Sequence, residues 1–448
     1  MIGTYKQKIK TRVLRPIQHF MGNERAGGIV LAFSVALALA LANSPLREAY
    51  FAFFDQHFGF VVNGREFFNF SLEHWINDGL MSLFFFVVGL ELKREFISGE
   101  LRQLRKVLLP IGAAVCGMLV PSAIYLALNA GTPTAGGWGI PMATDIAFAL
   151  AVVAALGPRV PLSVKVFLTT LAIVDDIGSV LVIAFFYTST ISVANLAVGF
   201  GFLALMFAAN KMGVKNIWFY AVVAIVGVWA SFLTSGVHAT ISAVLAAFMI
   251  PADAALSERA FLVRIKGHEE DFEAAEGNEF STLEEEQVQI IRAIRYDAAQ
   301  AIPPVQRIER VLHPFVSFVI MPIFALGNAG VTFVGMDVAS VFDNGVAVGV
   351  LLGLLVGKPV GIVLSSWLLG RLGVGSLPSG MSFRHLVGVG FLASIGFTMS
   401  MFVTTLAFPD PLTHVQAKVG IFAASIVGGT VGYLLLRRCG KAGDEEVG

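Results

Sequence analysis

The sequence predicts an all-α polytopic membrane protein with about twelve transmembrane helices, and three observations carry this prediction. The chain of 448 residues is 56% hydrophobic and only 14% charged, with a mean hydropathy of +0.77. Apolar runs of about 20 residues, the length that crosses a hydrocarbon core as a helix, recur along the chain. Basic residues cluster in alternate connections between these runs. A soluble protein of this length would instead form roughly three domains.

Twelve spans can be placed from the apolar runs. They cover approximately residues 26–43, 73–97, 107–130, 136–156, 161–187, 193–210, 217–233, 235–250, 312–330, 345–370, 384–407 and 414–437. Under the positive-inside rule, the connections rich in Lys and Arg and both termini are cytoplasmic. We therefore expect a cytoplasmic segment 1–25, eight spans within 26–250, a cytoplasmic loop 251–311, four spans within 312–437 and a cytoplasmic tail 438–448.

One outer connection carries the signal of a small external β-hairpin. Residues 58–70 contain two apolar runs that flank Asn63-Gly64, a dipeptide typical of two-residue hairpin turns. An isolated two-stranded hairpin is marginally stable in water, so we expect it to pair with another element, such as the same hairpin of a second subunit. An ordered external loop is the alternative.

The long inner connection, 251–311, contains an acidic stretch from Glu269 to Glu279. Ser281 and Glu284 have the spacing of a capping box. An apolar stripe follows at Leu283, Ile290, Ile291, Ile294 and Ala298. We expect a solvated linker with one surface helix, and a regulatory role is the alternative.

Two adjacent carboxylates, Asp175 and Asp176, lie inside an otherwise apolar span. A single carboxylate at the membrane centre costs about 2.5–3.5 kcal/mol on insertion scales. Two neighbouring acids therefore indicate an ion or proton site. Adjacent helix residues point about 100° apart, so one acid can face a cationic partner while the other faces a water-filled cavity.

Two spans are interrupted at corresponding places in the two halves of the chain. In span four, Pro141 breaks the helix, and Thr144 and Asp145 are suitable caps for a new helix start. Span eleven contains several glycines between residues 388 and 396. Paired interruptions of this kind indicate the binding site of a secondary transporter.

Lys358 is a cation deep within span ten. The surrounding sequence is not a Walker A motif, because Gly353 is one residue too close and Pro359 replaces Ser/Thr, so no nucleotide is expected. The sequence also lacks the basic face that nucleic-acid binding would need. We expect Lys358 to pair with Asp175 or with the carbonyl ends of the broken helices.

Five motifs occur in order over nearly the whole chain. They are Met142–Ala149 (MATDIAFA), Leu171–Gly178 (LAIVDDIG), Ser235–Thr240 (SGVHAT), Val356–Pro359 (VGKP) and Ile395–Ser400 (IGFTMS). Together they resemble the bacterial NhaA sodium/proton antiporters, a family that is itself a standard example of inverted repeats with two discontinuous, crossing helices.

The resemblance implies a transporter rather than an enzyme. It would exchange cytoplasmic Na⁺, and also Li⁺, for external protons in an electrogenic and pH-regulated cycle, without a cofactor. Asp176 would be the principal sodium ligand, with Asp175 as its partner in proton coupling and Thr144 as a further ligand. Asp145 would lie at the crossing of the broken helices, opposite Lys358.

The resemblance further implies a homodimer in the bacterial inner membrane, joined through the hairpin at 58–70. It links Glu91, Glu95, His238, Glu309 and His313 to pH response. Arg310, where relatives can carry a His, and the long acidic inner loop leave the pH set-point open. The sequence also leaves open the Na⁺/Li⁺/K⁺ selectivity, the stoichiometry and whether Lys358 carries a transported proton.

Two other membrane functions fit the residues less well. An intramembrane aspartyl protease would place its acids on separate helices, commonly after Gly-x-Gly, and that context is absent here. An ion channel would line an open pore with rings of acids, which the buried Lys358 and the broken helices disfavour.

Overall fold

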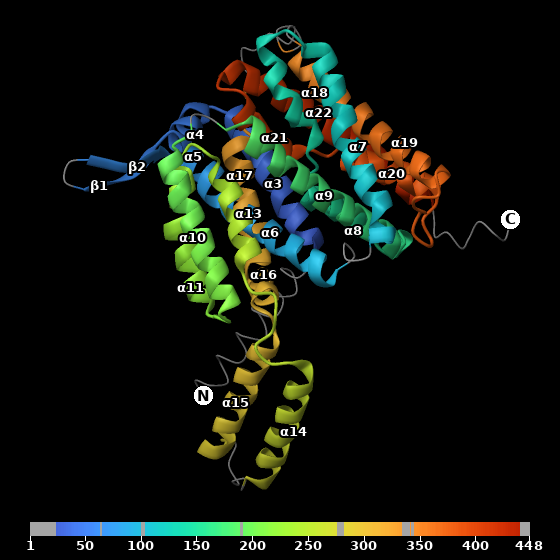
Figure 1. Cartoon of the computed structure of the whole chain (residues 1–448). Helices are drawn as coiled ribbons and strands as arrows, with labels where there is room; N and C mark the ends of the chain where they lie inside the picture. The colour runs from blue at the N-terminus through green and yellow to red at the C-terminus, as the bar shows by residue number, and fades with distance from the viewer. Residues whose placement is uncertain are drawn as a thin grey trace, which may run out of the picture.

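The computed structural model describes residues 24–62, 65–99, 104–188, 191–275, 282–333, 341 and 345–439. The predicted N-terminal segment up to residue 23, the turn Asn63-Gly64, Ser281 and the tail from residue 440 lie outside these ranges. The described elements are helices and one pair of strands (Figure 1).

The first half of the chain contains the following elements. They are α3 (Glu24–Ala42), α4 (Arg47–Phe54), β1 (His57–Val62), β2 (Arg65–Ser71), α5 (Leu72–His74), η2 (Trp75–Leu80), α6 (Met81–Ser98), α7 (Leu104–Asn129), η4 (Pro133–Met142), α8 (Ile146–Leu156), η5 (Gly157–Arg159), α9 (Leu162–Phe186), α10 (Val193–Lys211), α11 (Ile217–Val222), η6 (Val223–Trp229), α12 (Ala230–Leu233) and α13 (Ala239–Met249).

The second half begins with a pair of helices that the sequence did not predict as a pair. Its elements are α14 (Glu258–Ala274), α15 (Glu285–Ala301), α16 (Pro304–Phe315), η7 (Val316–Ile320), α17 (Met321–Asn328), α18 (Val346–Leu352), η8 (Gly353–Gly357), α19 (Lys358–Arg371), α20 (Phe383–Ala393), α21 (Phe397–Ala407) and α22 (Pro411–Cys439).

The helices confirm the predicted polytopic all-α fold. Among the described residues, nine helices are long and apolar enough to cross a membrane. The pair α20 and α21, bent by 43°, forms a tenth span, and Ile217–Leu233 and Ala239–Met249 are shorter apolar helices. These elements lie at the twelve predicted places. The ninth predicted span starts earlier than expected, because its helix α16 begins at Pro304.

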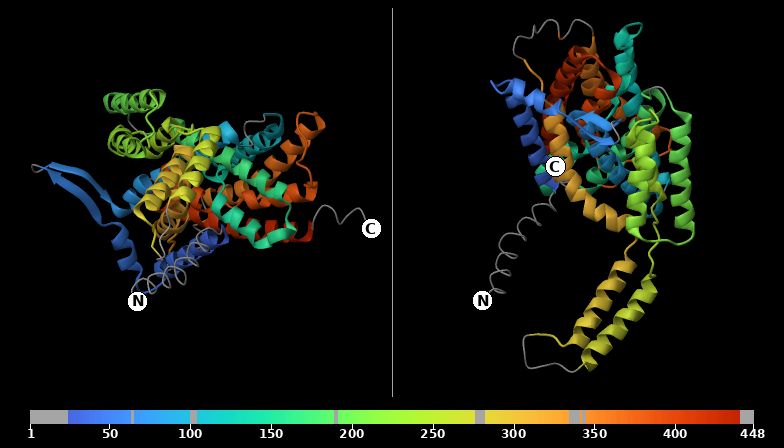
Figure 2. Two further views of the ribbon diagram at one scale, coloured as in Figure 1. Left: turned by 90° about the horizontal axis from the view of Figure 1, so that it is seen from below. Right: turned by 90° about the vertical axis from the view of Figure 1, so that its left-hand side faces the viewer.

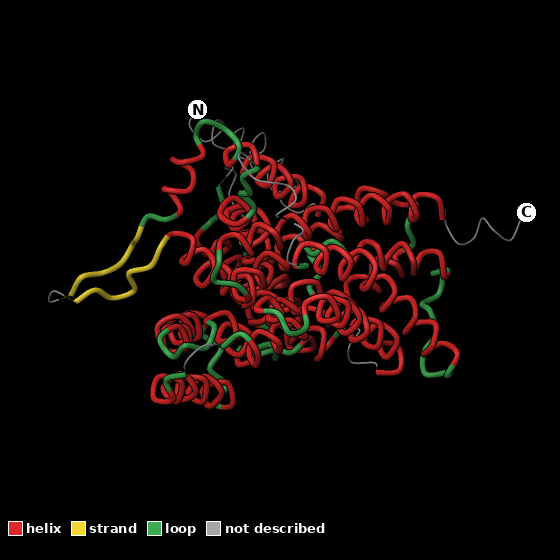
Figure 3. Tube along the Cα trace, turned by 90° about the horizontal axis from the view of Figure 1, so that it is seen from above, coloured by secondary structure: helices red, strands yellow, loops and turns green. Residues whose placement is uncertain are grey.

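The predicted hairpin is present, and the alternative of an ordered loop is wrong. Strands β1 and β2 pair antiparallel with His57 opposite Ser71 and Val62 opposite Arg65. The register shifts between Phe58 and Phe60, where Gly59 lies against the backbone of the opposite strand. The hairpin projects well beyond the helices (Figure 3).

The expectation of one helix in the connection 251–311 is wrong, because α14 and α15 form a helical hairpin. The two helices lie side by side and extend away from the body of the molecule (Figures 1 and 2). Asp297 joins them through Arg264 at 2.9 Å and His268 at 3.1 Å. The hydrogen bond with His268 and the charge of Arg264 hold the pKa of Asp297 below its usual range.

The capping box of α15 also differs from the prediction. It consists of Glu284 and Gln287 rather than Ser281 and Glu284. The predicted apolar stripe is only partly covered, since Leu283 and Ile291 are exposed. The hairpin therefore has a weaker apolar seam than the sequence pattern indicated.

Close packing of α7 against η8 and α19 places Lys358 in the centre of the molecule. Gly357 contacts α7 so closely that a Cβ atom there would lie 2.7 Å from the Cα of Pro121. A Cβ atom on Gly353 would lie 2.7 Å from the Cβ of Pro141. Small residues spaced by four let transmembrane helices approach in this way. Lys358 follows Gly357 and is therefore held beside the interrupted span four.

Candidate functional site

The two interrupted spans lie against each other at their breaks. The first break separates η4 from α8 at residues 143–145, and the second separates α20 from α21 at residues 394–396. The backbone N–H of Asp145 donates to the carbonyl of Ile395 at 2.6 Å. The Ser400 hydroxyl donates to the carbonyl of Ile140 at 2.8 Å. Each break thus satisfies backbone groups freed in the other, as interrupted helices in a membrane require.

Asp145 caps two helices with one carboxylate. Its Oδ1 accepts the N–H of Phe148 at 3.1 Å at the start of α8. Its Oδ2 accepts the N–H of Thr398 at 3.0 Å and the Thr398 hydroxyl at 2.5 Å at the start of α21. A carboxylate suits the partial positive charge of both helix ends. Because both oxygens are occupied, Asp145 contributes to the architecture of the site.

Thr144 does not cap α8, which corrects the prediction for this residue. Its hydroxyl lies 2.6 Å from Oδ2 of Asp175 and 3.1 Å from the carbonyl of Ala393. Thr144 therefore joins the break in span four to α9 and to the end of α20. Its side chain is fully buried.

Lys358 and Asp175 form the ion pair that the sequence suggested. The Lys358 Nζ lies 2.9 Å from Oδ2 of Asp175, and both side chains are 0% exposed. Lys358 also donates to the carbonyl of Met142 at the end of η4. A cation at this position compensates the partial negative charge at the carbonyl end of a broken helix. The second oxygen of Asp175, Oδ1, is buried and has no partner among the described residues.

Asp176 differs from its neighbour in having no protein partner. Its side chain is 3% exposed, and no hydrogen bond or ion pair reaches its carboxylate from the described residues. A buried carboxylate without a partner is energetically costly. Asp176 and Oδ1 of Asp175 offer carboxylate oxygens, which are ligands that hard cations prefer.

Four of the five residues that the resemblance links to pH response gather at the C-terminal end of α6. Arg94 lies 2.5 Å from Glu309 on α16 and 3.1 Å from Glu95. His313 lies 3.9 Å from Glu91. These contacts join α6 to α16, so a change of protonation at any of the acids would alter the contact between the two helices.

His238, the fifth residue, lies elsewhere. It precedes α13 and forms a hydrogen bond of 2.8 Å with the carbonyl of Tyr187 at the end of α9. The Tyr187 hydroxyl donates to the carbonyl of Gly136 and accepts the N–H of Gly139. His238 therefore belongs to a group of contacts that joins the C-terminal end of α9 to η4.

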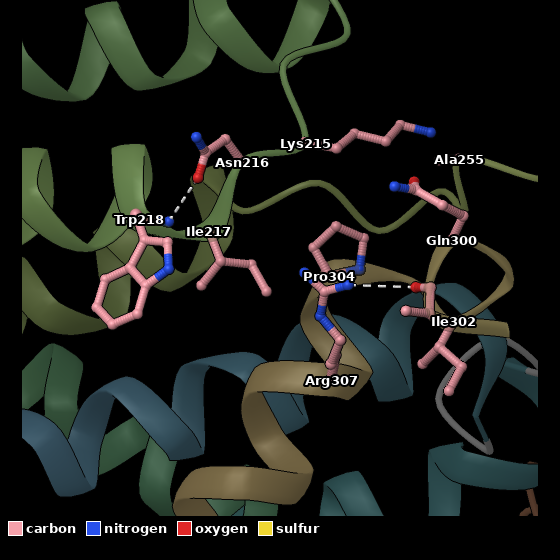
Figure 4. A pocket seen from close by; sticks show the side chains of 10 residues that line it. Lys215, Asn216, Ile217, Trp218, Ala255, Gln300, Ile302, Pro304 and Arg307 are labelled. Atoms are coloured by element: carbon pink, nitrogen blue, oxygen red, sulfur yellow. Dashed lines mark hydrogen bonds between the residues drawn. The ribbon is translucent and has the colours of Figure 1, made fainter. Parts of the chain in front are cut away.

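A cavity of about 520 Å³ lies between the α10–α11 connection and the base of the α14–α15 hairpin. Lys215 and Trp218 line it from the α10–α11 side, and Gln300 and Arg307 line it from the base of the α14–α15 hairpin (Figure 4). It contains none of the predicted ion-site residues. Lys215 and Arg307 both donate to backbone carbonyls, of Ala254 and Ala299 respectively, so these two cations have local structural partners.

Sequence reasoning missed one contributor to the site. Thr398 lies within the last of the five motifs, but nothing local indicates that it binds Asp145 across the crossing. This contact joins segments that are distant in sequence, so no spacing rule could have found it. The carbonyl of Met142, which accepts from Lys358, is one of the carbonyl ends of broken helices at which the sequence analysis expected Lys358.

Known proteins are similar to this chain along almost its entire length. The model of a family described as Na+/H+ antiporter 1 matches residues 18–436. The chain is 46% identical over 431 residues to the Na(+)/H(+) antiporter NhaA of Oleidesulfovibrio alaskensis, covering 95% of this chain and 94% of that relative. It is 45% identical over 412 residues to the Na(+)/H(+) antiporter NhaA 1 of Psychromonas ingrahamii, covering 92% and 93%. It is 43% identical over 427 residues to the Na(+)/H(+) antiporter NhaA of Acidithiobacillus ferrooxidans, covering 95% and 97%.

Proposed function

The chain belongs to the Na+/H+ antiporter 1 family, and from this membership we propose that it exchanges cytoplasmic sodium ions for external protons across the bacterial inner membrane. As a member of this family it is a transporter and not an enzyme. The observation that carries the finer proposal is the unequal environment of Asp175 and Asp176. One acid is engaged by Thr144 and Lys358, and the other has no hydrogen bond or ion pair to any residue that the structure describes.

In this proposal, sodium binds between the two carboxylates. Asp176 supplies the principal ligands, while Asp175 contributes its unpartnered Oδ1, and the Thr144 hydroxyl adds a neutral oxygen. Hard cations prefer several oxygen ligands of this kind. Two carboxylates in a confined site repel each other, so protons compete with sodium for the same oxygens. Sodium and protons therefore occupy the site alternately.

Alternating access converts this competition into exchange. Sodium enters from the cytoplasm and displaces protons, and protons replace it when the site opens to the outside. If both carboxylates take up a proton as one sodium ion leaves, each cycle moves net charge, which makes the exchange electrogenic. The crossing of the broken spans supports this proposal because its two halves are tied at Asp145 and Thr398, which gives the site a fixed centre.

We further propose that lithium is a second substrate and that pH regulates exchange through the inner cluster. Lithium is also a hard cation that prefers oxygen ligands. Arg94 and His313 connect the acids of α6 and α16, and protonation of Glu309 or Glu91 would weaken those contacts. This would couple cytoplasmic pH to the packing of α16 and so support pH and sodium homeostasis.

We also propose a homodimer with both termini in the cytoplasm. The β1–β2 hairpin is two-stranded and projects beyond the helices (Figure 3). Strands of this kind can extend across to a second copy, because an edge strand presents unpaired backbone groups. The side chains of Phe60 and Val61 are strongly exposed, which is consistent with a partner at this surface.

The exchange itself can be tested with everted membrane vesicles. We expect addition of sodium or lithium to dissipate a pre-formed pH gradient, and potassium to have little effect. Measuring the response from acidic to alkaline pH would give the set-point. Absence of any response to sodium over that range would contradict the proposal.

A further inference from the structure

The α14–α15 hairpin has no apolar core of its own. No residue of α14 is buried, and the buried residues of α15 are the polar Gln287 and Asp297. Phe261, Ile265 and Ile294 are only half-buried, although they lie on the helix faces that carry the polar contacts of Asp297. Most helical stability in proteins comes from packing of an amphipathic face. Both helices therefore present apolar surface that another element could cover.

The end of this hairpin that is farthest from the helical body is strongly acidic. Exposed carboxylates follow one another at the end of α14 and at the start of α15, namely Glu269, Glu270, Asp271, Glu273, Glu284, Glu285 and Glu286. Residues 269–275 and 282–291 contain no basic residue. Glu285 has an ion pair with Arg292, but at 3.9 Å and with both side chains 73% exposed.

The acids of α14 are also placed unfavourably along the helix. Glu269, Glu270, Asp271 and Glu273 lie in its last two turns, where the helix dipole is negative. A charge of the wrong sign at a helix end is destabilising. A cationic segment bound here would remove this cost, and a cationic amphipathic segment could also cover the apolar surface.

The chain contains one segment with these properties outside the described ranges, residues 1–23. Its basic residues are Lys6, Lys8, Lys10, Arg12 and Arg15, and it contains no Asp or Glu. Its apolar residues Ile2, Tyr5, Ile9 and Val13 recur with the period of a helix. The basic residues fall on both sides of that apolar face. The segment is thus complementary to the hairpin in charge and in pattern.

The segment is tethered on the correct side of the molecule. α3 begins at Glu24, and alternation of the spans puts the start of α3 and the hairpin on the same face of the helical body. With the amphipathic part up to Arg15 docked, residues 16–23 are the tether and can span up to about 28 Å when extended, which is comparable to the length of α14, about 26 Å. Tethering of this kind gives an effective concentration on the order of millimolar, so modest contacts are sufficient for docking.

We propose that residues 1–23 dock on the α14–α15 hairpin of the same chain. The apolar face of the segment covers the seam at Phe261, Ile265 and Ile294, and its basic residues lie against the acids at the end of α14. The base of the hairpin is closed by the backbone carbonyl of Gln300 in α15, which accepts the N–H groups of Ala255 and Leu256 at 2.9 and 3.1 Å. It is held to the start of α16 by the N–H of Val305, which donates to the carbonyl of Pro251 at 3.3 Å. The docked segment therefore connects the start of the first span to α16.

The docking can be measured in the full-length protein with spin labels on Thr11→Cys and Gln289→Cys, after replacement of Cys116 and Cys439. The protein is placed in nanodiscs of neutral phosphatidylcholine and diluted with unlabelled protein. We expect the distances between the two labels to be short and narrowly distributed, and the distribution to broaden at high salt. Reversal of Glu269, Glu270, Asp271 and Glu273 to Lys should broaden it, and additional reversal of Lys6, Lys8, Lys10 and Arg12 to Glu should restore it. The control variant Glu48→Lys/Asp55→Lys, with two exposed acids on the opposite face, should leave it unchanged.

A second measurement is independent of charge reversal. Deletion of residues 2–22 should make backbone hydrogen exchange in α14 and α15 about tenfold faster, because a docked segment protects what it covers, and should leave α10 unchanged. Any of four results would overturn the proposal. The distance distribution could stay unchanged when the acids are reversed, or it could fail to recover in the combined variant. The contact could also require anionic phosphatidylglycerol, or it could form only between different copies of the chain.

Discussion

The Nζ of Lys358 lies 2.9 Å from Oδ2 of Asp175, and neither side chain is exposed to solvent. The pair joins α19 to α9 at the place where Lys358 also holds the carbonyl of Met142. A buried ion pair is a weak source of net stability, but removal of one partner leaves an uncompensated buried charge. Asp175 and Lys358 should therefore be strongly coupled.

Substitution Lys358→Met should destabilise the protein more than the double change Lys358→Met/Asp175→Asn. Removing one partner of a buried pair typically costs about 3–5 kcal/mol, and replacing both costs much less. Thermal unfolding of the purified protein, followed in detergent, measures the difference. Asp175→Asn alone completes the comparison. If the effects of Lys358→Met and Asp175→Asn simply add in the double variant, the ion pair does not hold these helices together.

Asp145→Ala should remove the caps of both α8 and α21. The loss of one cap costs about 1 kcal/mol, so two caps should cost about 2 kcal/mol. Asp410→Ala is the matched control, since Asp410 caps only α22 through Thr413. We expect Asp145→Ala to lower both the melting temperature and sodium exchange, and Asp410→Ala to lower only the melting temperature. Equal effects of the two variants on exchange would argue against a special role of the crossing.

Glu309→Gln should shift the pH dependence of exchange while the maximal rate stays near that of the parent protein. The change removes a charged contact of 2.5 Å with Arg94, and a loss of about 1.4 kcal/mol corresponds to about one pH unit. Rates in everted vesicles, measured across pH, would show the shift. The exposed Glu285→Gln serves as control. An unchanged profile for Glu309→Gln would remove this residue from the pH response.

Deletion of residues 58–70 should yield monomers that still exchange ions. His57 and Ser71 are cross-strand partners, so their Cα atoms are only about 5 Å apart and a short glycine linker can join them. Light scattering of the detergent-solubilised protein measures its mass. Because the dimer would depend on hydrogen bonds of the strand backbone, the variant Val61→Thr should still form dimers. Dimers that persist after the deletion would place the subunit contact elsewhere.

Much of the transmembrane fold could be predicted because the bilayer imposes a simple rule on sequence. A helix must be about 20 apolar residues long to cross it, so the spans and the exceptional acids Asp175 and Asp176 stand out. The pairing of Lys358 with Asp175 could be predicted because a charge buried in an apolar run is costly unless an opposite charge lies beside it. The Asn63-Gly64 turn likewise predicted the strands on either side.

Other features depended on contacts between distant segments. Asp145 was recognised as a cap for α8, but its second role at α21 requires that Thr398 lie opposite it, which only the crossing provides. Thr144 has the composition of a cap and instead contacts Asp175. The helix α14 was missed because its acidic C-terminal half lacks an apolar period and resembles a solvated linker.

The central claim is that Asp176 is the principal sodium ligand, and Asp176→Asn tests it most directly. The variant keeps the size of the side chain, so we expect the protein to elute and melt like the parent protein, with Asp410→Asn as a control for loss of an acid outside the spans. In everted vesicles, the Asp176→Asn protein should no longer dissipate a pH gradient when sodium is added. Sodium-dependent dissipation at the rate of the parent protein would contradict the assignment of Asp176 as the site of exchange.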